Sequence, residues 1–175
     1  LDLVKYIEDG KPDKARGDTP AAMQDMRKLE IRIIKDTVLG RATTLLAEAK
    51  DKDAKDIARK GYDEATLAYD RAVKFIDASP RDQEQVNRLG SQATFLAQRS
   101  VRLAEEVAKL KEVKPRDLEQ VVVESEQRMQ RVAEAMHHPD VRDLSLTEQS
   151  VTLAKAAEKL ASQNDKQSAA DTEKL

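Results

Sequence analysis

The sequence predicts an all-α fold, an elongated antiparallel bundle of four to five helices with heptad-type packing. Apolar residues recur at alternating spacings of three and four in successive segments, which keeps one narrow apolar seam on each helix. Charged residues make up 37% of the chain and aromatic residues only 3%, a composition typical of long helices rather than sheets. Three of the five prolines fall where one seam ends and the next begins, and a fourth, Pro20, precedes the first seam.

The first helix is expected to begin at Thr19 and Pro20, because a hydroxyl caps free backbone amides and proline suits the first helical position. We therefore assign residues 1–18 to an N-terminal arm or linker. The helix should extend to about Ala49. Its expected core stripe consists of Ile31, Ile34, Val38, Ala42, Leu45 and Ala49.

Three further apolar residues, Met26, Leu29 and Ile33, widen this stripe at its N-terminal end. A helix that is apolar over a broad arc has more surface to cover than one neighbour can reach. We expect the first helix to contact more than one neighbour, and these three side chains are the candidate protein-binding residues.

The second and third helices have regular seams. A polar stretch, 51–56, separates the first helix from the second, and Ser79 and Pro80 predict the start of the third, which should reach about Glu112. The second seam consists of Ala58, Tyr62, Ala65, Tyr69, Ala72 and Ile76. The third consists of Val86, Leu89, Ala93, Leu96, Ser100, Leu103, Val107 and Leu110.

The last two helices complete the bundle domain, which we place at 19–163. Lys114 and Pro115 open the fourth helix, and Pro139 closes it. Ser145 and Glu148 form a capping box for the fifth. The two seams consist of Leu118, Val122, Ser125, Met129, Val132 and Met136, then Leu146, Ser150, Leu153, Ala157 and Leu160. Residues 164–175 are expected to be a polar, disordered tail.

Composition excludes several classes of function. The formal net charge is −2, with 31 basic and 33 acidic side chains interspersed, so we expect no nucleic-acid partner, which would require a basic stripe. No apolar run approaches 18 residues, so no membrane span is expected. Cysteine is absent, which removes disulfides and thiolate chemistry. No nucleophile turn or phosphate-binding glycine loop occurs, so we expect neither an enzyme nor a cofactor.

His137 and His138, the only histidines, are the one candidate for a metal site. Adjacent helical residues face different ways, so both would bind one ion only if the chain left the helix, which Pro139 allows, with Asp140 and Asp143 as further ligands. The other interpretation is a polar helix end at which histidine complements the negative pole of the helix dipole. We prefer the helix end and predict no metal ligands.

Residues 41–111 resemble the helical domain of unknown function found in bacterial envelope lipoproteins, where it often precedes an OmpA-like peptidoglycan-binding domain. The likeness is carried by Arg41–Ala49, Tyr62, Ala65, Tyr69, Ala72, Ala93, Ala97, Leu103–Glu106 and Ala108. It implies a cell-envelope or periplasmic location and supplies no catalytic residues; a cytoplasmic location stays open. A second resemblance, to tetratricopeptide helices, is carried by Ala65, Tyr69, Ala72 and Pro80.

These patterns predict a non-catalytic helical adaptor or scaffold of the bacterial cell envelope that binds another protein through a helix face. The partner is of unknown identity. Three alternatives remain: a homo-oligomeric coiled-coil spacer, a tetratricopeptide-like peptide-binding module, and a small-ligand or metal-binding bundle.

Overall fold

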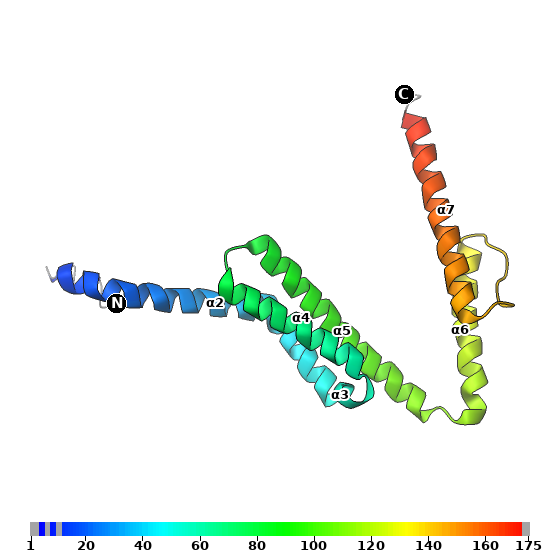
Figure 1. Cartoon of the computed structure of the whole chain (residues 1–175), viewed down its shortest axis with the longest axis horizontal. Helices are drawn as coiled ribbons and strands as arrows, with labels where there is room; N and C mark the ends of the chain where they lie inside the picture. The colour runs from blue at the N-terminus through cyan, green and yellow to red at the C-terminus, as the bar shows by residue number, and fades with distance from the viewer. Residues whose placement is uncertain (1–3, 6–7, 10–11, 173–175) are drawn as a thin grey trace. The chain divides into compact units, whose positions relative to one another are not determined.

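The computed structural model is all-α, as predicted, and contains no strand among the residues that it describes, 4–5, 8–9 and 12–172 (Figure 1). The contacts divide the chain into two compact units, 1–112 and 113–175. This division differs from the single bundle domain expected over 19–163. The boundary follows the last residue of a helix, and Lys114 beyond it has the extended backbone that a following proline favours.

The first unit is a bundle of three long helices, α2 (Pro12–Asp51), α4 (Arg59–Ala78) and α5 (Gln83–Glu112), with a single turn, α3 (Ala54–Ile57), between the first two. The start of α2 corrects the expected arm over 1–18, because residues 12–18 are helical. Pro12 meets the same first-position preference that was used to place the start at Pro20. The remainder of that arm, apart from residues 4–5 and 8–9, lies outside the described residues.

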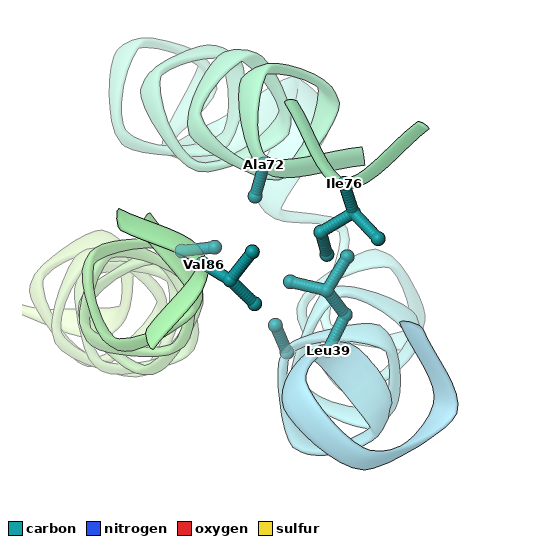
Figure 2. Close-up of a cluster of buried hydrophobic side chains, with 6 residues drawn as sticks. Leu39, Ala72, Ile76 and Val86 are labelled. Carbon is teal, nitrogen blue, oxygen red and sulfur yellow. The ribbon is translucent and has the colours of Figure 1, made fainter. Parts of the chain in front are cut away.

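Two clusters of buried side chains hold the three helices together. Figure 2 shows the first, in which Leu39 of α2, Ala72 and Ile76 of α4 and Val86 of α5 point toward one another. The second lies nearer α3 and includes Leu45, Ala49, Ala97, Val101 and Ala104. Residues of the first three predicted seams are thus buried together.

Small residues allow α5 to approach its neighbours more closely than the seam pattern predicts. A Cβ atom on Gly90 would overlap Val38 of α2, and one on Gly61 would lie 2.5 Å from the Leu103 Cδ1 atom. Gly90, Ala97 and Ala104 are all buried and lie seven residues apart, beside the predicted seam of α5. Close approach to α2 therefore accounts for Gly90, whereas a Cβ atom on Gly61 would meet only the flexible Leu103 side chain.

The turn between α4 and α5 corrects the expected start of the third helix at Pro80. Helix α5 begins at Gln83, and Asp82 provides its cap: the Asp82 Oδ1 atom accepts a hydrogen bond from the Gln85 amide at 3.1 Å. An aspartate at this position satisfies an amide that has no partner within the helix. Ser79, Pro80 and Arg81 form the turn instead.

The second unit contains a short 3-10 turn, η1 (Pro115–Asp117), and two helices, α6 (Leu118–Ala135) and α7 (Leu146–Thr172). The predicted capping box is confirmed, because the Ser145 amide donates to the Glu148 carboxylate at 3.0 Å and the Glu148 amide donates to Ser145 Oγ at 3.4 Å. The expected disordered tail over 164–175 is wrong as far as Thr172. This segment contains no glycine or proline, and its polar residues allow the helix to continue.

Contacts between α6 and α7 involve only part of each helix. Ala133, Val141 and Leu153 are buried, together with partly buried neighbours from the last turns of α6 and the loop. Leu118, at the start of α6, and Leu160, late in α7, are exposed, and Figure 1 shows α7 continuing past the end of α6. The predicted seams of this unit are therefore covered only near the C-terminal end of α6 and in the N-terminal part of α7. No described helix is both long enough and apolar enough to cross a membrane.

Candidate functional site

The N-terminal half of α2 has a row of exposed apolar side chains, which we call the outer stripe. It consists of Met23, Met26, Leu29 and Ile33, which expose 66%, 72%, 56% and 54% of their surface. The three residues singled out from the sequence are therefore all at the surface. Their spacing of three and four keeps them along one side of the helix.

The outer stripe faces away from the bundle core because of helical geometry. Each residue turns about 100° around the axis, so Met26, Leu29 and Ile33 point to the side opposite Ala42 and Leu45. Those two residues are buried in the clusters that α2 forms with α4 and α5, whereas every residue of the outer stripe is more than half exposed. The broad apolar arc of the sequence is thus divided into an inner face within the core and an outer face without cover.

Two ion pairs beside the outer stripe form within α2. The Lys28 Nζ atom lies 3.1 Å from Asp25 Oδ1, and the Arg32 Nε atom lies 3.9 Å from Asp36 Oδ2. All four side chains are more than two-thirds exposed. Exposed pairs of this kind contribute little to stability, so they remain available to a binding partner at little cost.

Beside the outer stripe is an open pocket of about 700 Å³, formed by α2 and the turn between α4 and α5. Met23 and Met26 line it from α2, and Pro80 and Arg81 line it from the turn. Apolar side chains with charged groups at the margin suit the insertion of a partner's apolar side chain.

A two-pronged ion pair fixes the edge of this pocket. The Arg81 Nε and Nη2 atoms donate to the Glu30 Oε1 and Oε2 atoms at 3.0 and 3.2 Å. These hydrogen bonds hold the pKa of Glu30 below its usual value and raise the pKa of Arg81. The planar guanidinium matches the carboxylate, so the pair joins the turn to α2 in one orientation.

Gly40 continues the outer face of α2 and differs from the other mid-helix glycines. It lies seven residues beyond Ile33 and fourteen beyond Met26, on the same side of the helix. A Cβ atom built there would have no neighbouring atom within 4 Å. Glycine within a helix costs roughly 1 kcal/mol relative to alanine, and at Gly40 no contact among the described residues requires it.

His137 and His138 form the end of α6. The His137 and His138 amides donate to the Glu134 and Ala133 carbonyls at 3.0 and 2.9 Å, and His137 has a left-handed backbone with φ 52°. This hydrogen-bond pattern is the Schellman motif, in which the left-handed position usually belongs to glycine. Over the described part of the chain, no group of three or more His, Cys, Asp or Glu side chains is arranged to hold a metal ion.

Sequence reasoning missed two parts of this site. Met23 was overlooked although it precedes Met26 by three residues, a spacing that places it on the neighbouring turn. Arg81 lies 51 residues from Glu30, so no local pattern connects the two. The turn at Pro80 was the only signal near Arg81, and it marked a helix boundary rather than a site.

Comparisons of the chain with protein-family models, curated proteins and solved structures gave no match.

Proposed function

We propose that this chain is a non-catalytic helical adaptor or scaffold that binds another protein molecule through the outer stripe of α2. The observation that carries the proposal is the alignment of four large apolar side chains, each more than half exposed, on one face of a helix. Soluble proteins seldom leave contiguous apolar surface of this kind uncovered, and patches of this kind are common at binding sites. The binding mode is helix packing, in which a partner helix covers positions three and four residues apart.

The energetics of the outer stripe fit a reversible partner. Complete burial of a Leu, Ile or Met side chain stabilises by about 1.5–3 kcal/mol, so covering the exposed half of each residue contributes roughly 1 kcal/mol. Four such residues offset only part of the entropy lost on association. The adjacent pocket beside Met23 and Arg81 adds a place where one partner side chain can be enclosed.

A matched pair of leucines tests this proposal. Leu29 lies in the outer stripe and Leu67 lies on α4, and they expose 56% and 53% of their surface. We would compare L29D and L67D in the full chain, after circular dichroism has shown that both fold. The measurement is the set of proteins that co-purify with each variant from the source cells, together with a differently tagged copy of the chain itself.

The proposal expects L29D to lose bound protein that the wild type and L67D retain. Equal recovery with L29D and L67D would exclude the outer stripe as the binding surface. Unfolding of L29D alone would also refute the proposal, because it would make Leu29 a core residue.

The cell-envelope location is proposed on the resemblance of residues 41–111 alone. Fractionation of cells that express the full-length protein tests it, and the proposal expects the chain in the periplasmic or membrane fraction. Recovery in the cytoplasmic fraction alone would remove the envelope from the proposal and leave the outer stripe unaffected.

A further inference from the structure

We infer that the occupant of the outer stripe is a second copy of this chain, with the two α2 helices packed antiparallel across a two-fold axis. This inference rests on the proposed function, since it names the partner of the same surface. The geometry of the outer stripe, the charges beside it and the unexplained glycine on its line carry the argument.

The outer stripe is self-complementary when a second copy runs in the opposite direction. Three residues of the outer stripe, Met26, Leu29 and Ile33, occupy the alternating inner positions of a heptad pattern together with the neighbouring, partly buried Ala22, whereas Met23 lies beside that line. Aligning Met26 of one copy with Leu29 of the other also aligns Ala22 with Ile33. The two-fold axis repeats both contacts, so four apolar layers form without a gap.

The flanking charges favour this orientation. Asp25 and Arg32 immediately precede Met26 and Ile33, so both lie on the same side of the outer stripe. In the antiparallel pair, Asp25 of each copy faces Arg32 of the other, which forms two equivalent ion pairs. A parallel pair would instead place Asp25 opposite Glu30, whose carboxylate already accepts hydrogen bonds from Arg81, and would form no such ion pair. Charge thus selects the antiparallel arrangement.

Gly40 provides an independent observation. A Cβ atom on Gly90 would overlap Val38, and one on Gly61 would meet the Leu103 side chain, whereas the space outside Gly40 is open. In the antiparallel pair, the helix of the second copy continues along this face toward its own N-terminus and passes Gly40. A residue without a side chain permits close helix approach there.

The small size of the contact predicts a weak dimer. Four apolar layers bury less than a standard stable interface of about 1,200 Å². We therefore expect a dissociation constant on the order of 10–100 µM and a monomer at low concentration.

Charge reversal with complementation tests the inference in the full chain. Sedimentation equilibrium from 5 to 500 µM is expected to show a monomer–dimer equilibrium for the wild type. D25R and R32D should each weaken self-association at least tenfold, because like charges then meet at both ends. An equimolar mixture of D25R and R32D should restore dimers, since every pair becomes Arg with Asp. D70R, at an exposed position on α4, is the control and should dimerise like the wild type.

Orientation can be tested separately because the chain has no native cysteine. A mixture of A22C and I33C is expected to form the mixed disulfide, since these positions face each other only in the antiparallel pair. In a parallel pair they would be about 16 Å apart along the axis, and only the two homodimers would form. Predominant homodimers, or stronger association of D25R, would overturn the antiparallel assignment.

A wild-type chain that stays monomeric at 500 µM would refute the second copy as occupant. If L29D still lost a different bound protein in that case, the proposed function would stand with another partner. If L29D lost nothing, both proposals would fail.

Discussion

The division of α2 into a core face and an outer face predicts opposite outcomes for one substitution at two positions of the same helix. Leu39 lies among Ala72, Ile76 and Val86 (Figure 2). It exposes 1% of its surface, whereas Leu29 exposes 56%. Leu39→Ala removes buried methyl groups and leaves a cavity, which costs about 3–4 kcal/mol. Leu29→Ala removes surface that water already reaches, so we expect a cost below about 0.5 kcal/mol.

Urea unfolding monitored by tyrosine fluorescence measures both free energies of unfolding. All three tyrosines lie within residues 1–112, so the signal reports the first unit alone. Leu39→Ala should lower the midpoint by about 1.5–2 M, and Leu29→Ala should leave it within about 0.3 M of the wild type. Samples below 5 µM keep self-association from contributing. Equal losses at the two positions would show that the outer stripe is core and would refute the argument for a binding surface.

Four further outcomes follow from the packing and the charges. Gly40→Ala should stabilise the first unit by about 0.5–1 kcal/mol, because alanine favours the helix and the space there is open. Gly90→Ala should destabilise it by about 1–3 kcal/mol, because the added methyl group overlaps α2. Urea unfolding measures both changes. Asp82→Ala should cost about 1 kcal/mol in the same assay, because the cap of α5 is lost. Hydrogen bonds from Arg142 lower the pKa of Asp140 to about 2 from 3.8, so this carboxylate stabilises the second unit above pH 4, and its contribution is lost as pH falls from about 4 to 2. The titration of Asp140 can be followed by NMR of its carboxyl carbon, and a midpoint near pH 4 would contradict the ion pair with Arg142.

The sequence predicted the packing correctly where large apolar side chains at regular spacing determine which helix faces are buried. The seams around Ile76 and Val86 predicted which residues meet, because large apolar groups at helical spacing have to be covered. It was less informative where small residues act. Gly90 and Ala97 bring α5 close to its neighbours, yet they add almost nothing to a hydrophobic pattern.

The sequence predicted some of the helix ends and some of the residues of the candidate site, and missed others. Pro12 and Pro20 both satisfy the rule for a first helical position, and only the structure distinguishes them. Met26, Leu29 and Ile33 were identified as surplus apolar residues because the arc was too wide for one neighbour. The Arg81 side of the pocket depends on tertiary folding and has no local signal.

The continuity of α2 has a kinetic consequence for any partner. Between Thr19 and Leu29 every residue of the helix except Ala22 is exposed, and isolated helices of about 12–15 residues are only marginally stable in water. The bundle supplies its nucleus, so unwinding should start at the free end and stop near Ile31, where packing begins. Amide hydrogens from Met23 to Leu29 should therefore exchange with solvent faster than those around Leu39. A protein that binds the outer stripe would slow that exchange. The exchange rates of these amides therefore report whether the outer stripe is bound.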